Sequence, residues 1–349
     1  MHSKKNQTTQ PTQEFPVFNN WNEIANGWYF AFPSKDLPKN EVKPIQICGQ
    51  ELVFYRGADG KVRALDAYCP HMGTHLGKGK VVENNIRCFF HHWQFNEEGV
   101  CVDIPCQKEI PDKAKVQKYS VEERYGAIWI YPSDKPSHTL VDFPELHHSV
   151  EKKVSFGKVY ERTCHHHVTM INGIDPQHLK TVHQLDIEMK IDISEVQNGN
   201  MIDISLKGKI GKGVWREKLA RFFLGPEYSY SMRYDHGNNG FLTLMRDVYF
   251  FKFKWPTLHM IFAYRPLEKG RLMVQPIYVT KKRKGLLGWM ISGILIWMTK
   301  KAFFALQGED GAVYENMRFY PGNLLQIDRP VAQYIQYVNK LKTSSWKLP

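Results

Sequence analysis

The residues of this chain most suited to redox chemistry are two mixed cysteine and histidine pairs. Cys69 and His71 are separated by one residue, and, after sixteen further residues, Cys88 and His91 are separated by two. Two thiolates and two imidazoles are the ligands of a Rieske [2Fe-2S] cluster, in which the thiolates hold one iron and the imidazoles the other. Such a cluster is easier to reduce than an all-cysteine cluster. The spacing therefore predicts a centre that accepts and passes single electrons.

A zinc site is the nearest alternative for these four ligands. Zinc sites of this composition usually present a Cys-Cys pair followed by a His-His pair, whereas each pair here is mixed. We therefore prefer the cluster. His92 adjoins His91, but the two-residue spacing from Cys88 selects His91, and we expect His92 to lie beside the ligands or on the surface.

A second group of possible metal ligands follows in the middle of the chain. Pro176 suits the first position of a helix after Asp175. His178 and His183 would then lie a little over one turn apart, where both can face one ion. Two histidines and a carboxylate form the facial triad of non-haem Fe(II) oxygenases. Because an electron donor needs an acceptor and the sequence has no flavin or dinucleotide motif, we expect a mononuclear iron here.

The carboxylate of this triad must come from another segment. The acidic, glycine-flanked stretch 307–315 contains Glu309 and Asp310. We choose Asp310, although spacing alone leaves Glu309 open. The simpler interpretation is that Asp175 only caps a helix and that no second iron is bound. The protein would then be a Rieske electron carrier with an accessory domain, or a lipid-binding module.

Length and patterning predict two domains that position these residues. The chain has 349 residues, of which 42% are hydrophobic, which allows two separate cores. Short strands and turns in 28–131 indicate an all-β domain, and 133–148 is a linker. A strand over 154–170, a helix over 172–185, four or five strands in 201–280 and helices in 286–341 predict an α+β domain with an antiparallel sheet. The boundaries are a flexible tail at 1–20, a cluster domain at 21–135 and a catalytic domain at 136–349.

Charge and cysteine content restrict the partners. A formal charge of +12 favours an acidic protein partner or an anionic membrane, and no nucleic-acid-binding motif accompanies it. Six cysteines are too few for a disulfide framework, and no signal peptide is evident, so we expect a cytoplasmic, reducing location. His165, His166 and His167 fall on the predicted strand, whose side chains alternate in direction, and no third metal is expected there.

The apolar segment 285–298 lies between basic residues. It is too short to span a bilayer. An interfacial helix in peripheral contact with a membrane, a wall of the substrate entrance and a buried helix all remain open.

Taken in order, these motifs resemble the Rieske non-haem iron oxygenases over about residues 28–341. The resemblance rests on C-x-H-x16-C-x2-H, then N-x2-D-x2-H-x4-H, then E-D-x2-V-Y. Residues 88–105, the stretch around Asp310 and 328–331 are most similar to the oxygenase component of 3-ketosteroid 9α-hydroxylase and to cholesterol 7-desaturases. The family usually has proline after the second cysteine and glycine after the second histidine, where this chain has Phe89 and His92.

The resemblance implies a Rieske domain followed by a helix-grip, START-like catalytic domain. It places the cluster on Cys69, His71, Cys88 and His91, and the Fe(II) on His178, His183 and Asp310. It makes Asp175 a bridge from His178 to a cluster histidine of the neighbouring subunit in a homotrimer.

The resemblance also implies the reaction. O₂ would be the cosubstrate, and NAD(P)H would act only indirectly, through a separate flavin or ferredoxin-type reductase. The substrate would be a hydrophobic, sterol-like or polycyclic small molecule that is hydroxylated or desaturated. Aromatic and methionine residues of the second domain are consistent with an apolar pocket: Phe222, Phe223, Tyr228, Tyr230, Met232, Phe250 and Phe251.

Overall fold

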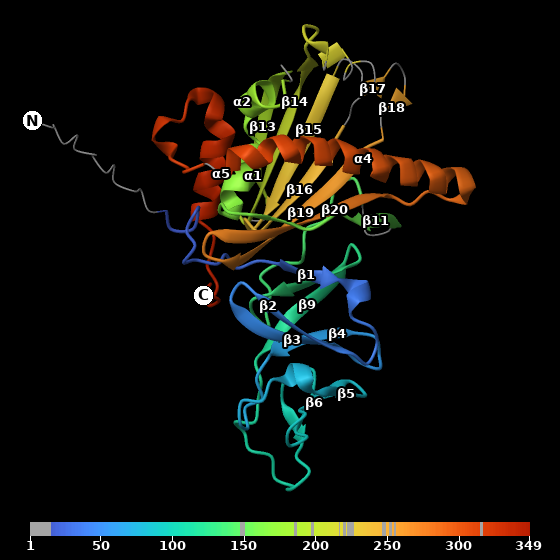
Figure 1. The fold of residues 1–349 in the computed structure, drawn as a ribbon, viewed down its shortest axis with the longest axis vertical. Coiled ribbons are helices and arrows are strands. Elements are labelled where there is room, and N and C mark those ends of the chain that lie inside the picture. The colour runs from blue at the N-terminus through green and yellow to red at the C-terminus, as the bar shows by residue number, and fades with distance from the viewer. Residues whose placement is uncertain are drawn as a thin grey trace, which may run out of the picture.

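The computed structural model contains two β-rich parts stacked along the long axis of the molecule (Figure 1). It describes residues 15–146, 151–184, 187–196, 199–215, 217–218, 221, 227–245, 249–250, 253–254, 256–314 and 317–349. The first part is all-β, and the second is an antiparallel sheet with helices, as predicted.

The first part is built on a six-stranded antiparallel sheet in the order β1-β10-β9-β4-β3-β2. Its strands are β1 Tyr29–Pro33, β2 Val42–Ile47, β3 Gln50–Arg56, β4 Val62–Asp66, β9 Lys118–Arg124 and β10 Ala127–Tyr131. The predicted hairpin around 57–60 is the β3-β4 turn, where Gly60 has a φ of +81° that favours glycine. Short 3₁₀ helices at Ser34–Asp36 (η1) and Leu76–Lys78 (η2) lie beside this sheet.

A smaller four-stranded sheet carries the two predicted cluster loops. Its strands, in the order β5-β6-β7-β8, are β5 Lys80–Val82, β6 Asn85–Arg87, β7 Gln94–Phe95 and β8 Cys101–Asp103. The loop with Cys69 precedes β5, and the loop with Cys88 joins β6 to β7. A common hydrophobic core holds both cysteines together with Leu76, Ile86 and Phe95.

The second part is built on an eight-stranded antiparallel sheet. Strands β11-β20-β19-β16-β15-β14-β13 follow one another in space, and β12 also pairs with β20. Their bounds are β11 Lys152–Phe156, β12 Tyr160–Arg162, β13 Ile187–Val196, β14 Met201–Ile210, β15 Glu227–Asp235, β16 Asn239–Leu244, β19 Leu258–Glu268 and β20 Arg271–Lys281. A separate hairpin comprises β17 Tyr249–Phe250 and β18 Phe253–Lys254.

Four α-helices accompany this sheet among the described residues. They are α1 His166–Asn172, α2 Pro176–Thr181, α4 Gly285–Tyr314 and α5 Arg329–Asn339, with 3₁₀ turns η3 Pro321–Asn323 and η4 Gln326–Asp328 before α5. The helix predicted over 172–185 is therefore two short helices, with Gly173 as the C-cap of α1 and Pro176 at the start of α2. Helix α4 crosses one face of the sheet and contacts β19 and β20 (Figure 1).

The strand predicted over 154–170 is wrong at its C-terminal end. His165 caps the N-terminus of α1, and His166 and His167 are its first two residues. Their side chains are buried instead of alternating between two faces. Burial lowers the pKa of His166 to about 3, so that this ring is neutral in the folded protein.

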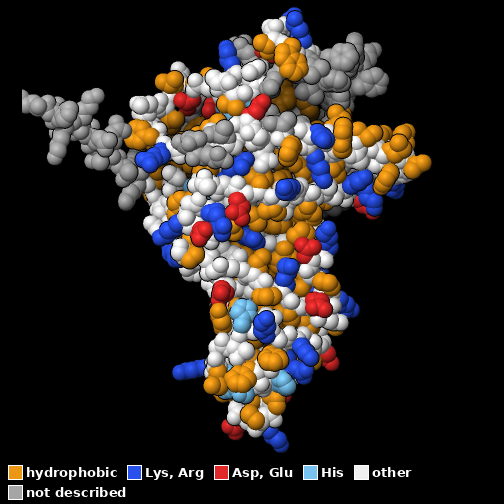
Figure 2. Space-filling view, viewed as in Figure 1, with side chains coloured by type: hydrophobic (Ala, Val, Ile, Leu, Met, Phe, Trp, Pro, Cys, Tyr) orange, Lys and Arg blue, Asp and Glu red, His pale blue; other side chains and the backbone are white. Residues whose placement is uncertain are grey.

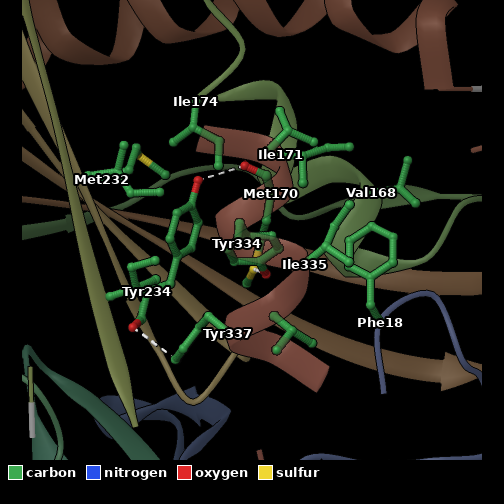
Figure 3. Close-up of a cluster of buried hydrophobic side chains, with 14 of the residues drawn as sticks. Phe18, Val168, Met170, Ile171, Ile174, Met232, Tyr234, Tyr334, Ile335 and Tyr337 are labelled. Carbon is green, nitrogen blue, oxygen red and sulfur yellow. Dashed lines mark hydrogen bonds between the residues drawn. The ribbon is translucent and has the colours of Figure 1, made fainter. Parts of the chain in front are cut away.

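Helix α1 is anchored by tyrosines of β15 and α5 (Figure 3). The Tyr234 hydroxyl donates to the backbone oxygen of Met170 at 2.7 Å, and the Tyr334 hydroxyl lies 2.8 Å from its sulfur. The Tyr337 hydroxyl donates to the backbone oxygen of Tyr234 at 3.2 Å. All three rings are almost fully buried, and each hydroxyl has a partner. This packing fixes the C-terminal end of α1, from which the chain leads to α2 and the predicted iron ligands.

Both ends of the described chain depart from the predicted boundaries. Phe18 was expected in a flexible tail ending at residue 20, but its ring is fully buried and stacks on His167. Trp346 and Leu348 were expected in the second domain, but they pack in the core of the six-stranded sheet. Thr343 pairs with Ala25 in an isolated bridge. The C-terminal residues therefore connect the two parts of the molecule.

This connection leads to a testable stability difference. Trp346 is 2% exposed and contacts the rings of Tyr29 and Tyr119. Trp346→Ala should cost about 3–5 kcal/mol of unfolding free energy, because it leaves a large cavity. The neighbouring change Lys347→Ala removes an exposed ion pair with Glu23 and a hydrogen bond to the backbone oxygen of Asn22, and it should cost less than about 1 kcal/mol. Equal losses in denaturant unfolding would contradict a core role for Trp346.

Candidate metal centres

The three residues predicted to bind a mononuclear iron converge in space. His178 lies on α2, His183 lies just beyond its C-cap Val182, and Asp310 lies near the end of α4. The Nε2 atoms of the two histidines are 2.8 Å apart. The Oδ1 atom of Asp310 is 3.0 Å from His178 Nε2 and 3.3 Å from His183 Nε2. One atom of each residue therefore faces a common point.

These distances fit a single metal ion. Two ligand atoms at right angles, each about 2.1 Å from one ion, lie about 3.0 Å apart. The three residues would occupy one face of the ion's coordination shell, which is the facial arrangement of two histidines and one carboxylate. The other positions would remain open to a substrate or to O₂. The donor set therefore suits Fe(II).

Glu309, which the sequence left open as the carboxylate ligand, contacts His183 on the other side of its ring. Its Oε2 atom lies 2.7 Å from Nδ1 of His183, on the side of the ring away from Asp310. A hydrogen bond from Nδ1–H to this carboxylate leaves a lone pair on Nε2. That lone pair faces the Asp310 oxygen, and two acceptors at this distance require a cation or a proton between them. Glu309 thus orients His183 as a carboxylate that supports a metal-ligating histidine does.

The electrostatics of the triad depend on the same contacts. Burial alone would raise the pKa of Asp310, but hydrogen bonds from His178 and His183 lower it to about 2. Burial alone would lower the pKa of His183, whereas Asp310 and Glu309 raise it. The carboxylate is consequently ionised at neutral pH, and a metal ion would displace a proton from His183.

A mostly apolar cavity of about 160 Å³ opens onto the triad. Tyr228, Tyr230 and Met232, named from the sequence as possible pocket residues, line it. The side chains of the other four named residues, Phe222, Phe223, Phe250 and Phe251, lie outside the described part of the chain. Asn172 also lines the cavity, and its Nδ2 is 3.0 Å from His178 Nε2. The triad therefore faces a space suited to an apolar molecule with few polar contacts.

Asp175 caps α2, as the simpler interpretation of the sequence predicted. Its Oδ1 atom accepts the backbone N–H of Gln177 at 2.9 Å and that of His178 at 3.4 Å. Burial raises its pKa, against the lowering effect of these two N–H groups. The cap uses one carboxylate oxygen, Oδ1, so Oδ2 can accept a further hydrogen bond.

The four predicted cluster residues lie on two adjoining loops. The sulfur-bearing residues Cys69 and Cys88 are 3% and 2% exposed, whereas His71 and His91 are exposed, with ring centroids 4.6 Å apart. Burial raises the pKa of the Cys69 thiol to about 12, so its thiolate requires a nearby cation. Two buried cysteines and two exposed histidines fit a cluster whose cysteine-bound iron faces the core and whose histidine-bound iron faces solvent.

The second loop explains one of the two departures from the family pattern. His92 has a φ of +62°, in the left-handed region that glycine adopts most easily. The backbone at this position requires a positive φ, which explains why glycine is usual here. His92 adopts the same conformation at some cost in strain. Phe89 and Phe90 are 64% and 56% exposed, so they extend the surface beside His91 and do not fill the loop.

The two sites lie at opposite ends of the molecule. Figure 1 shows β5 and β6 at one end of the long axis and α2 near the other, with the six-stranded sheet between them. Sequence reasoning did not reveal this separation, and it overlooked the roles of Asn172 and Glu309. The signal for Glu309 was present as an acidic residue adjoining the chosen ligand.

Comparison with known proteins identifies the first part of the chain. Residues 27–120 match the model of the Rieske [2Fe-2S] domain. Cholesterol 7-desaturase of Hemicentrotus pulcherrimus is 41% identical over 170 residues, which are 45% of this chain and 35% of that protein. The chain thus aligns with only about a third of that relative's length.

Other matches cover more of the chain or bear on the resemblance. A cholesterol 7-desaturase of Ciona intestinalis is 26% identical over 95% of this chain and 70% of its own length. The oxygenase component of 3-ketosteroid-9-alpha-monooxygenase of Rhodococcus rhodochrous is 34% identical over 35% of this chain and 32% of that protein. Dicamba monooxygenase shares the fold, with a TM-score of 0.65 at 20% identity over 91% of this chain and 97% of that one. The chain therefore contains a Rieske [2Fe-2S] domain at residues 27–120 and shares its overall fold with dicamba monooxygenase.

Proposed function

We propose that this protein is the oxygenase component of a multicomponent Rieske system. The observation that carries the proposal is the convergence of two imidazoles and one carboxylate on a single point that opens into a mostly apolar cavity. A Rieske electron carrier or a lipid-binding module needs no such triad. Bound Fe(II) would supply the activation of O₂, with electrons from the cluster.

Some residues around the proposed iron site would bind the ion, and others would orient its ligands. His178, His183 and Asp310 would hold the ion, and Glu309 keeps the His183 ring in place through Nδ1. The Asn172 Nδ2 atom lies 3.0 Å from His178 Nε2, the nitrogen that would bind the ion, so a bound ion would replace this contact. The apolar wall of the cavity excludes water from the reacting atoms. Cys69, Cys88, His71 and His91 would hold the cluster.

We propose a hydrophobic, sterol-like or polycyclic substrate. Support comes from the lining of the cavity, which includes Met232, Leu242, Met260 and Phe262, and from relatives named for cholesterol and for a ketosteroid. Hydroxylation and desaturation both begin with removal of hydrogen from the substrate, so the same site suits either outcome. NAD(P)H would supply the electrons through a separate flavin or ferredoxin-type reductase.

We further propose a homotrimer in which one chain's cluster serves the next chain's iron. Within one chain the cluster loops and α2 lie at opposite ends (Figure 1), so direct electron transfer between them is unfavourable. Head-to-tail contact would bring exposed His71 or His91 against Asp175 of a neighbour. The Asp175 cap leaves Oδ2 to accept a hydrogen bond from a ring N–H.

Metal analysis distinguishes this function from its alternatives. The purified protein should contain about three irons and two acid-labile sulfides per chain, because the triad adds one iron to the two of the cluster. A carrier or a lipid-binding module would contain about two irons. An iron-to-sulfide ratio of one in the fully loaded protein would contradict the oxygenase assignment.

Paired substitutions test the roles of the two acidic neighbours. Asp310→Ala should remove the mononuclear iron and all turnover while the electron paramagnetic resonance signal of the cluster remains, since it opens the triad. Glu309→Ala should retain the site but weaken iron binding or activity by about 10–100-fold, because it removes only the support of His183. The opposite pattern would make Glu309 the ligand.

A mixing experiment tests the trimer. His91→Ala should abolish the cluster signal, His92→Ala should preserve it, and His178→Ala should remove only the mononuclear iron. Co-assembled chains carrying His91→Ala and His178→Ala separately should recover part of the activity, because some interfaces join an intact cluster to an intact triad. Mixed trimers without activity, or an active monomer in sedimentation, would overturn the arrangement.

Asp175→Asn separates the proposed role of Asp175 as a bridge between subunits from its role as a helix cap. Asparagine still caps a helix, so the variant should keep its fold and its iron content. The loss of charge should slow electron transfer from cluster to iron in single-turnover measurements. An unchanged rate would indicate that Asp175 is a cap alone.

A further inference from the structure

The N-terminal half of α4 is an exposed hydrophobic helix. Figure 2 shows hydrophobic side chains gathered over its projecting end at the right of the molecule. Leu286, Leu287 and Trp289 are 78%, 72% and 63% exposed. The exposed apolar residues of α4 are Leu286, Leu287, Trp289, Met290, Ile291, Ile294, Trp297, Met298 and Phe304. They form the surface that we call the α4 apolar surface.

The distribution of these residues around the helix indicates an apolar partner. Successive residues of an α-helix are about 100° apart, so the exposed run 289–291 alone spans about 200° of the circumference. A helix that is hydrophobic on all sides is normally buried in protein or lipid. Among the described residues, no helix is long and apolar enough to cross a membrane. The length from Leu286 to Met298 is about 20 Å, shorter than the roughly 30 Å of a bilayer core.

The charges around this surface favour anionic lipid. Six basic residues and no acidic residue occur between positions 281 and 308. Lys281, Lys282, Lys284 and Lys301 are exposed, and Lys153 contributes from β11, with Nζ 4.8 Å from the Trp289 ring centroid. Glu151, which pairs with Lys282, is the acidic residue nearby. Cations at the edge of an apolar helix, with tryptophans between them, are typical of helices that lie in the headgroup region.

A second cavity lies between this surface and the cavity at the triad. It has a volume of about 530 Å³ and lies between α4, β12 and β20, with Trp297, Lys301 and Phe304 of α4 and Val159 along its rim. Tyr160, Phe303 and Gln307 line both this outer cavity and the cavity at the triad. Three shared side chains are therefore the partition between a membrane-facing opening and the reacting atoms.

From these observations we infer that the α4 apolar surface docks in the surface of an anionic bilayer and that the outer cavity admits the apolar substrate from the lipid. The docking is inferred from α4 and the charges around it, whereas the entry of substrate through the outer cavity rests on the proposed function. Docking places the rim of the outer cavity at the level of the acyl chains. Substrate then reaches the triad without crossing water, once Tyr160, Phe303 and Gln307 move apart.

Vesicle flotation tests the docking. The protein should float with phosphatidylcholine vesicles that contain phosphatidylserine, and less with phosphatidylcholine alone. Lys281→Gln with Lys284→Gln should weaken binding to the anionic vesicles by about 10- to 30-fold, from the loss of two cationic contacts. Replacing Leu286, Leu287 and Trp289 by serine should abolish flotation. Leu325→Ser, at a residue 64% exposed elsewhere on the surface, is the matched control and should float normally.

Sedimentation separates a lipid partner from a second copy of the chain. The triple serine variant should keep the oligomeric state of the unaltered protein, because lipid and not protein covers the surface. Nitroxide-labelled lipid should quench part of the tryptophan fluorescence, and Trp289→Phe with Trp297→Phe should remove that quenching. Loss of oligomerisation with no change in flotation, or flotation that the substitutions leave intact, would overturn the docking.

Transfer of a radiolabelled sterol from vesicles tests the passage. Val159 lines the outer cavity but not the triad cavity, so Val159→Trp narrows the outer rim and should slow transfer several-fold while flotation remains normal. Unchanged transfer, or none into the unaltered protein, would overturn the passage. A protein that floats but contains two irons per chain would contradict the proposed function and leave the docking intact.

Discussion

The second part of this molecule depends on the approach of three polar side-chain atoms from two distant segments. His178 and His183 are supplied by α2 and the residues that follow it, and Asp310 arrives on α4, more than a hundred residues later. Their mutual distances of 2.8–3.3 Å would be unfavourable without a shared cation or proton. The surrounding structure must therefore hold them against repulsion. The packing of Tyr234 and Tyr334 around Met170, together with the Glu309 contact to His183, provides that support.

Helix α4 links three properties of the protein. Its C-terminal part supplies Asp310 and Glu309, its middle contributes Phe303 and Gln307 to the cavity walls, and its N-terminal part projects as an apolar surface. The apolar end, the walls of the cavity and the proposed metal ligand Asp310 therefore lie on one continuous helix.

The separation of the two redox sites constrains the assembly. Electrons gained by an exposed cluster at one end of the chain would reach a triad at the other end only through an intermediate. In the proposed homotrimer, a heterologous interface would repeat the same donor-to-acceptor contact at each junction and close on itself. The exposed side chains around the cluster, His71, His91, Phe89 and Phe90, provide the apolar and hydrogen-bonding groups that such a contact uses.

Much of this arrangement could be predicted from the sequence, because local chemistry determines it. Two mixed cysteine and histidine pairs specify a cluster by spacing alone, and Pro176 after Asp175 specifies a helix start. The alternation of short strands and turns predicted the all-β first part. The domain match at 27–120 and the shared fold confirm these interpretations.

Other features were decided only by tertiary packing. The histidine run 165–167 has no local signal that distinguishes a strand from a helix start, and burial against Phe18 and Tyr334 decided it. The return of Trp346 to the first core depends on a partner surface remote in sequence. Glu309 and Asp310 are adjacent and chemically alike, so spacing could not separate them. The direction in which each leaves α4 places Asp310 beside Nε2 of His183 and Glu309 beside Nδ1, on opposite sides of the ring.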